Sequence, residues 1–455
     1  MNGDQTDATP VPGDLAGWLT KQRWFAGKAR PIKGVTPRDR IRVGPGTLHV
    51  VFVGFADTGE LERYLVALRA GQPMADALDD PGFCRALLDV VRRGAQVDGE
   101  RGTLIGRPGR AFPPDLPADI TARRLQGEQS NTSVIFGDRL IMKIFRRPAD
   151  GLNPELEITR FLTEHTTFRG TPRLAGAVEY TAEERGAGGR VTGIGGVATL
   201  AVLQEYVGGA RDGWRWLLDR LAAGDAALDA VRRLGTRTGE LHAALATPTP
   251  DPAFAAETIT RADVAGWADG VRRQIAAARE AARGRALPDV PDVGGAGGLG
   301  GLVGLAKSRH HGDFHLGQTL AVEDGRDFVI IDFEGEPLRP LEERRRKHTP
   351  LRDVAGMLRS IGYAAASARL GEAERRRWEA DARAAYLAAY RAAVSGAPFV
   401  PDSDEAFARA VAVLEVEKAA YEIVYEANNR PDWVEIPLAG FVNATASLAR
   451  SAGAA

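Results

Sequence analysis

The stretch that decides the fold lies between positions 310 and 337. It reads His-His-Gly-Asp-Phe-His-Leu-Gly-Gln at 310–318 and Phe-Val-Ile-Ile-Asp-Phe-Glu-Gly-Glu-Pro at 328–337. Residues 328–331 are apolar and mostly β-branched, as in a short buried strand. Asp313 and Gln318 precede this strand, and Asp332 and Glu334 follow it two residues apart. The order predicts a catalytic loop, a return strand and a metal-binding turn.

These side chains suit phosphoryl transfer. In protein kinases an Asp on the catalytic loop accepts the proton of the acceptor, and an amide five residues later and an Asp on the next turn hold magnesium. The Asp313–Gln318 spacing matches, with Gln in place of the usual Asn. Magnesium prefers hard oxygen ligands, which a carboxylate and an amide supply. His311 is interpreted as a buried residue that braces the loop.

Length and composition limit the classes of protein to which the chain can belong. The 455 residues predict two or three domains, and 44% hydrophobic content is ample for sizeable cores. Lys and Arg number 59 against 60 Asp and Glu, so charge indicates neither a nucleic-acid nor a membrane partner. Cys84 is the single cysteine, which excludes an internal disulfide and fits a reducing cytosol. With no leader and no apolar run long enough for a bilayer, we expect a cytoplasmic monomer.

The N-terminal part reads as a small sheet with helices. A short amphipathic helix is expected at 14–22, and strands at 48–55 and 61–68 can pair across Asp57-Thr58-Gly59. A further helix is expected at 83–93. Trp24 and Phe25 are interpreted as local core, and Lys28 as a surface charge.

Residues 125–145 form two β runs around a Gly137-Asp138 turn, preceded by a polar loop at 127–132 whose small residues let backbone N–H groups approach phosphate. Lys143 lies in the second run, where burial is costly unless it meets an anion. Asn153 and Pro154 then start a helix. Glu155 and Glu157 are both available to pair with Lys143, and Glu157 is preferred because it lies a turn inside the helix.

A buried strand at 199–207 leads into helices around 214–221 and 231–245, which is the placement of a kinase hinge, where adenine bonds to the backbone at 204–207. The residues assigned to ATP are Gln129, Ser130, Asn131, Thr132, Ser133, Lys143, Glu157, Gln204, Glu205, Tyr206 and Val207.

The C-terminal part is predicted to be helical, with helices at 260–283, 351–366 and 404–428. Asp353 is interpreted as a cap or loop anchor, the charged run 342–348 as solvated, and the glycine-rich stretch 293–304 as a flexible insertion. Tyrosines and carboxylates on the last helix can stack on a sugar and bond its hydroxyls; helix packing and a routine Lys418–Glu422 surface pair are the alternatives. The residues assigned to the sugar are His315, Glu417, Lys418, Tyr421, Glu422, Tyr425 and Arg430.

Taken together, the motifs resemble those of bacterial maltokinases. The resemblance covers Gln-Arg-Trp-Phe-Ala-Gly-Lys at 22–28, residues 128–136, Lys-Ile-Phe-Arg-Arg at 143–147, residues 311–318, 331–337 and 350–356, and the stretch 421–437, and so most of the chain. Gly-Asp-x-His is shared by the broader aminoglycoside-phosphotransferase-like kinases. The 22–28 and 331–337 motifs are more discriminating.

The resemblance implies an α+β, bilobal protein-kinase-like fold. It implies a cap subdomain at 1–95, a β-rich intermediate subdomain at 96–206 that completes the N-lobe, and a helical C-lobe at 207–455. It also implies ATP- and Mg²⁺-dependent phosphorylation of maltose to maltose 1-phosphate for α-glucan synthesis, with trehalose synthase as a partner. Asp313 would be the base, and Gln318, Asp332 and Glu334 would hold the metal.

Two alternatives stay open. The first is a glucosamine or other aminosugar kinase with a similar core and altered sugar contacts. The second is a catalytically silent kinase-like module that binds a metabolic partner, against which the intact Lys143, Asp313 and Asp332 argue.

Overall fold

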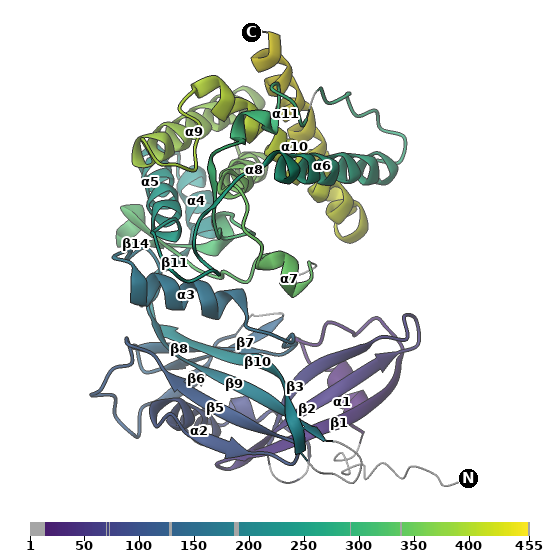
Figure 1. The fold of residues 1–455 in the computed structure, drawn as a ribbon, viewed down its shortest axis with the longest axis vertical. Helices are drawn as coiled ribbons and strands as arrows, with labels where there is room; N and C mark the ends of the chain where they lie inside the picture. The colour runs from purple at the N-terminus through teal and green to yellow at the C-terminus, as the bar shows by residue number, and fades with distance from the viewer. Residues whose placement is uncertain are drawn as a thin grey trace. The chain divides into compact units, whose positions relative to one another are not determined.

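The computed structural model describes residues 14–69, 71, 73–126, 130–185, 191–291, 293–336 and 339–453. The chain forms two compact units (Figure 1). The first comprises Met1–His165 and Pro172–Gly208, and the second comprises Thr166–Thr171 and Gly209–Ala455. The fold is of the α+β, protein-kinase-like class expected from the sequence.

The first unit begins with helix α1 (Leu15–Thr20), whose N-terminus is capped by Asp14. Next comes an antiparallel sheet in the order β1-β2-β3. Its strands are β1 Ile32–Val43, β2 Gly46–Phe55 and β3 Leu61–Arg69. The helix and the β2–β3 pairing match the predictions. Trp24 and Phe25 are buried against Phe55 and Tyr64, and Lys28 is exposed, which confirms their interpretation.

The same unit contains a seven-stranded sheet in the order β4-β5-β9-β10-β8-β7-β6. Its strands are β4 Gln96–Asp98, β5 Gly102–Pro108, β6 Ala122–Arg124, β7 Asn131–Phe136, β8 Leu140–Phe145, β9 Leu174–Arg185 and β10 Val191–Glu205. The hairpin expected at 125–145 is present as β7 and β8. Gly137 takes a left-handed φ of 57° at its turn, which glycine adopts without steric cost. β10 starts earlier than the predicted strand at 199.

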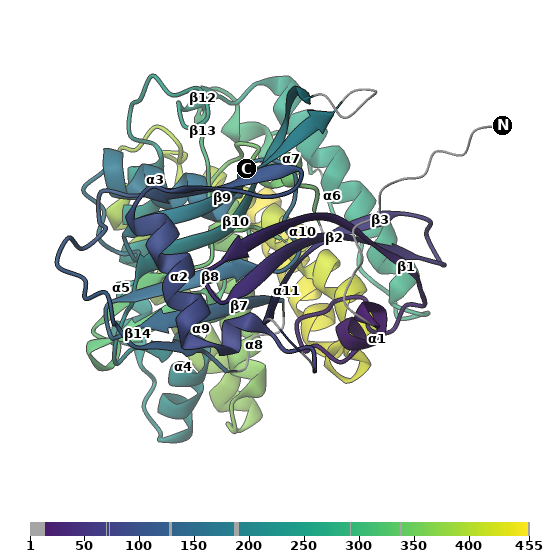
Figure 2. The ribbon, with the colours of Figure 1, turned by 90° about the horizontal axis from the view of Figure 1, so that it is seen from below.

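One hydrophobic core joins the two sheets of the first unit. It includes Ile41 and Leu48 of the small sheet and Val134 and Ile144 of the large one, together with helix α2 (Pro81–Arg92). Figure 2 shows α2 lying against strands of this unit. A backbone hydrogen bond from Leu65 N–H to Arg146 O (2.9 Å) ties β3 to the end of β8. The three-stranded and seven-stranded sheets of the first unit therefore pack on a common hydrophobic core.

The second unit is mostly helical, as predicted (Figure 1). Its helices are α4 Gly213–Ala222, α5 Leu228–Leu245, α6 Arg261–Ala281, α7 Leu341–Arg344, α8 Leu351–Ser367, α9 Glu372–Ala393, α10 Asp404–Asn429 and α11 Glu435–Gly453. Two small sheets accompany them, and these contain β11 Arg211–Asp212, β14 Thr319–Val322 and β15 Asp327–Ile330, and β12 Glu257–Thr258 and β13 Ala306–Lys307. The strand expected at 328–331 is β15. In the described ranges, no helix has the length and apolar character needed to cross a membrane.

Two expectations for the second unit are wrong. The glycine-rich stretch 293–304 is not a loose insertion, because it forms a short 3-10 helix whose Leu299 and Leu302 are fully buried against the other helices. The charged run 342–348 is not wholly solvated, because His348 at its end is buried and the side chain of Lys347 is only 8% exposed. In both cases packing against distant helices overrides what the local composition suggests.

Candidate functional site

The loop and the turn that bear the predicted chemistry are brought together by the β14–β15 pairing. Thr319 is opposite Ile330 in this antiparallel pair, and Ile331 N–H donates to Gln318 O (3.0 Å). The next residue, Asp332, therefore leaves the strand beside Gln318. Asp332 has a left-handed φ of 68°, a conformation that is uncommon for a residue with a side chain and that concentrates at functional sites.

Asp353 anchors the catalytic loop, as predicted. Its carboxylate accepts the backbone N–H groups of His311 (2.7 Å) and Gly312 (2.9 Å) and contacts His242 Nε2 (3.2 Å). Burial disfavours the Asp353 carboxylate, but the bond to His242 and the neighbouring imidazoles outweigh burial and lower its pKa. His311 Nε2 lies 2.9 Å from Ile331 O, which joins the loop to the return strand and confirms the bracing role.

Asp313 lies beside a lysine from a distant helix. Lys418 Nζ on α10 is 3.2 Å from Asp313 Oδ1 and 2.8 Å from Glu336 Oε1. Glu336 is buried, which disfavours its charge, but Lys418, Arg339 and Arg352 outweigh burial and lower its pKa to about 2. Burial also opposes the charge of Lys418, and its two carboxylate neighbours reverse that effect and raise its pKa. Lys418 and Glu336 are therefore both charged at neutral pH.

Glu336 was missed as a site residue from the sequence. The signal was present, since it is the second acid of the Glu-Gly-Glu turn at 334–336. The interpretation of Lys418 and Glu422 as a routine surface pair is wrong. Lys418 pairs with Asp313 and Glu336, whereas Glu422 pairs with Arg359 (2.9 Å).

The predicted metal ligands are an amide and two carboxylates at the end of this return strand. Among the described residues, no group of three His, Cys, Asp or Glu side chains could by itself hold a metal ion. The donor chemistry nevertheless fits magnesium, which binds proteins through one or two carboxylates and takes its other oxygens from substrate phosphates and water. The backbone juxtaposition of Gln318 and Asp332 is consistent with that arrangement.

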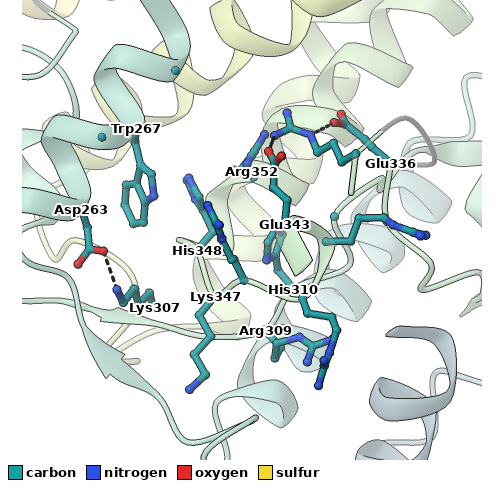
Figure 3. A pocket seen from close by; sticks show the side chains of 18 of the residues that line it. Asp263, Trp267, Lys307, Arg309, His310, Glu336, Glu343, Lys347, His348 and Arg352 are labelled. Carbon is teal, nitrogen blue, oxygen red and sulfur yellow. Dashed lines mark hydrogen bonds and ion pairs between the residues drawn. The ribbon is translucent and has the colours of Figure 1, made fainter. Parts of the chain in front are cut away.

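Two cavities lie near the loop that carries Asp313 in the second unit, and Figure 3 shows side chains that line the larger one. A small one, about 20 Å³, is lined by Asp313 and Lys418, and a large one, about 1010 Å³, extends toward α6 and the segment before α8. Gly312, Glu336 and Tyr421 line both, so the two spaces adjoin each other. Lysines and arginines outnumber carboxylates in their lining.

The carboxylates in this lining are already matched by basic groups. Those described are Asp313 and Glu336 with Lys418, Glu257 with Lys347, Asp263 with Lys307, Glu343 with Arg339, Glu417 with Arg352, and Asp353 with His242. A cationic ligand would therefore have to compete for each of these carboxylates with a partner that is already in place. This distribution favours a neutral or anionic ligand.

The residues assigned to the sugar separate into two groups. Glu417, Lys418 and Tyr421 line the cavities. His315 lies next to Asp313, and burial lowers the pKa of the His315 imidazole. Its Nδ1 accepts a hydrogen bond from the Gly317 N–H (3.1 Å). The other three face elsewhere. They are Glu422 on Arg359, the exposed Tyr425, whose ring is 6.4 Å from that of Tyr421, and Arg430, which pairs with Glu426 (2.6 Å).

The residues assigned to ATP lie in the first unit, apart from Gln129, which is outside the described residues. Lys143 is on β8, opposite Ser133 and Val202. Asn131, Thr132 and Ser133 are the first residues of β7, and Ser130 directly precedes it.

The helix that follows β8 is α3 (Pro154–His165). Asn153 Oδ1 caps its first turn through Glu155 N–H (2.9 Å), as predicted. Glu155 accepts a hydrogen bond from Gln204 Nε2 (2.9 Å), and Glu157 is also buried. Glu155 therefore links α3 to the end of β10, and Glu157 remains the proposed partner of Lys143.

The segment assigned to adenine follows the end of β10. Glu205 N–H donates to Arg173 O (3.0 Å) and Tyr206 N–H to Arg139 O (2.9 Å). These two amides are already engaged, so adenine would have to use other backbone groups of 204–207.

Comparison with known proteins identifies two family regions. Residues 18–108 match the maltokinase N-terminal cap domain, and residues 121–392 match the phosphotransferase enzyme family. The chain is 31% identical over 341 residues to a glucosamine kinase from Mycolicibacterium smegmatis, covering 69% of this chain and 77% of that protein. It is 29% identical over 373 residues to a glucosamine kinase from Streptacidiphilus jiangxiensis, covering 77% and 74%.

Solved structures show the same fold. A crystal form of a glucosamine kinase aligns with a TM-score of 0.68 at 25% identity, covering 96% of this chain and 97% of that one. A glucosamine kinase in complex with glucosamine, ADP and inorganic phosphate aligns with a TM-score of 0.64 at 23% identity, covering 95% and 99%.

Proposed function

Because the chain belongs to the phosphotransferase enzyme family, and is therefore an ATP-dependent phosphotransferase for a small molecule, we propose that its acceptor is maltose. The reaction transfers the γ-phosphoryl group of ATP to the anomeric hydroxyl and yields maltose 1-phosphate and ADP. The match of residues 18–108 to the maltokinase cap domain supports this choice. Use of the product in α-glucan synthesis, with trehalose synthase as partner, is part of the same proposal.

The observation that carries the proposal is the charge around Asp313. Glucosamine is a cation when its amine is protonated, and Lys418 Nζ lies 3.2 Å from the carboxylate that would face the acceptor. The two glutamates of α10 assigned to the sugar are both paired: Glu417 with Arg352 (3.2 Å) and Glu422 with Arg359 (2.9 Å). A neutral disaccharide avoids this repulsion and makes use of the large adjoining cavity.

The proposed chemistry uses a small number of residues of the chain. Asp313 accepts the proton of the anomeric hydroxyl as its oxygen bonds to the γ-phosphorus and the bond to ADP breaks. Lys418 orients Asp313, because its ammonium group donates a charge-assisted hydrogen bond to the carboxylate (3.2 Å). Glu336 holds the other side of the lysine (2.8 Å), which fixes the position of the ammonium group.

The nucleotide is proposed to bind through the first unit and the metal through the second. Lys143 on β8 contacts the phosphates, with Glu157 as its partner, and residues 130–133 lie against them. Gln318 and Asp332 would hold Mg²⁺, with Glu334 as a further ligand. The bound ion would neutralise charge on the phosphate oxygens.

Glucosamine remains a second candidate, because relatives that cover most of the chain are glucosamine kinases. The deciding experiment is ADP release by purified protein with ATP, Mg²⁺ and one sugar at a time: maltose, glucosamine, glucose or an aminoglycoside. We expect maltose to have the highest kcat/KM, and phosphate at its C1 by NMR. A higher kcat/KM for glucosamine would overturn the maltose proposal. The Asp313→Asn variant should bind ATP normally but lose activity roughly 10²-fold or more.

A further inference from the structure

The large cavity beside Asp313 has an aromatic wall that the proposed reaction leaves unused. The rings of Trp267 on α6 and His348 stack with centroids 3.8 Å apart and planes 25° apart. Both residues line the cavity (Figure 3). At about 1010 Å³, the cavity is at the upper end of the roughly 300–1,000 Å³ range of small-molecule sites, and one sugar ring at Asp313 would leave much of it to water.

The aromatic wall is held firmly in place. His348 is 8% exposed, and burial lowers its pKa, so the ring is neutral near pH 7. Its backbone exchanges two hydrogen bonds with Ser308 (3.1 and 3.0 Å), which begins the segment that leads to Asp313. Trp267 is on a helix whose N-terminus has a capping box formed by Thr260 and Asp263. A flat, rigid ring surface stacks on a sugar face with little loss of conformational entropy.

Oriented polar groups surround the wall. Lys307 Nζ is 2.6 Å from Asp263 Oδ1, and Lys347 Nζ is 2.6 Å from Glu257 Oε1. Figure 3 shows the Trp267 ring between the Asp263–Lys307 pair and His348. An aromatic face with fixed hydrogen-bonding groups at its edges matches a pyranose, which has an apolar face and a rim of hydroxyls.

We propose that the Trp267 wall is the subsite for the second glucosyl ring of the acceptor, the ring remote from the hydroxyl that is phosphorylated. This inference rests on the proposed function and adds the residue that makes the enzyme prefer a disaccharide. Gly312, Glu336 and Tyr421 line both spaces, so the chamber lies directly beside the space at Asp313, and the second ring of an acceptor held at Asp313 would extend toward it. Trp267 is thereby a specificity residue, not a catalytic one.

The test compares three variants on a long and a short acceptor. Trp267→Leu removes the flat ring, Trp267→Phe keeps one, and Asp269→Ala changes an exposed residue on the same helix that pairs with Arg272 and lines neither cavity. We expect Trp267→Leu to lower kcat/KM for maltose roughly tenfold or more, with about twofold change or less for glucose and for the KM of ATP. Trp267→Phe should recover most of the loss, and Asp269→Ala should match the native enzyme.

Binding of maltose is measured separately from turnover, by saturation-transfer NMR on the inactive Asp313→Asn protein. The protons of the ring without the free anomeric hydroxyl should receive strong saturation, and adding Trp267→Leu should remove it. An equal loss on maltose and glucose would show a structural role for Trp267 and overturn the subsite. Unchanged maltose kinetics would also overturn it. If the native protein prefers another acceptor, the maltose proposal fails, while the NMR experiment still decides whether the wall binds a disaccharide.

Discussion

Helix α10 has two faces of similar residue composition but different roles: one lines the cavities near Asp313, and the other packs against neighbouring helices. On one face Lys418 and Tyr421 line the cavities at Asp313. On the other face Glu415, Glu422 and Glu426 are each less than 15% exposed in their side chains, and they bond to Arg383 of α9 and to Arg359 and Tyr363 of α8, respectively. Residue type alone does not distinguish the two faces, because both carry side chains that suit sugar recognition. They differ in their surroundings: one face borders a cavity, and the other is buried and paired with neighbouring helices.

The second face is a set of structural ion pairs. Glu415 accepts two hydrogen bonds from Arg383 (2.8 and 2.7 Å), and Glu422 pairs with Arg359 (2.9 Å), a residue that is 3% exposed overall. These pairs join α10 to α8 and α9. The comparison teaches that a buried carboxylate whose partner is also buried belongs to the packing, whereas a buried cation that borders a cavity is available for chemistry.

The largest expected effect is on the catalytic face. Lys418→Met should lower kcat roughly 10²-fold or more, because Asp313 loses the hydrogen-bonded ammonium group that orients it. The melting temperature should change less than the activity, since Glu336 keeps Arg339 as a partner. Steady-state kinetics with maltose and ATP measure the loss. Activity near the native value would remove Lys418 from the mechanism.

The next effect is on the structural face and should appear in stability. Arg359→Met leaves Glu422 without its cation and should cost about 3–5 kcal/mol in the free energy of unfolding, measured by urea denaturation. The folded fraction should keep its kcat. The double variant Arg359→Met with Glu422→Leu is the matched control, and it should recover most of the stability because no buried charge is left unpaired. A selective loss of maltose binding in the single variant would instead return Glu422 to the sugar site.

A smaller effect is expected at Tyr421, which lines both cavities with its ring 5.0 Å from Lys418 Nζ. Tyr421→Ala should weaken maltose use by roughly 1–3 kcal/mol in kcat/KM through lost stacking and hydrogen bonding, with the KM of ATP unchanged. Tyr421→Phe separates the two contributions, because it keeps the ring. If both variants behave like the native enzyme, the acceptor does not contact this residue.

The smallest effect is expected at Tyr425, one turn further along α10. Its side chain is exposed and lines neither cavity. Tyr425→Ala should change the free energy of unfolding by no more than about 0.5 kcal/mol and leave maltose kinetics unchanged. A clear rise in the KM of maltose would show that the acceptor site extends beyond Tyr421 and that Tyr425 also contacts the acceptor.

Much of the architecture could be predicted from local pattern. The hairpin around Gly137, helix α3 with its Asn153 cap, and helices α5, α6, α8 and α10 all have strong periodicity or capping signals in the sequence. The roles of His311 and Asp353 were also accessible, because a polar side chain that becomes buried needs a fixed hydrogen-bond partner. The prediction of a flexible insertion at 293–304 was wrong. Glycine content describes the conformational freedom of the unfolded chain, whereas the structure here depends on the contacts that Leu299 and Leu302 make in the folded protein.

The sequence by itself determined the chemistry: an acid, an amide, a strand and a pair of acids in the order that phosphoryl transfer requires. Spacing was sufficient there because Asp313 to Glu336 is one continuous supersecondary unit. Only the tertiary structure decided which charges meet. Lys418 reaches Asp313 from 105 positions away, and Arg359 meets Glu422 across 63. Which residues pair across such sequence separations depends on how the helices pack, and this cannot be predicted from the residue types along one helix.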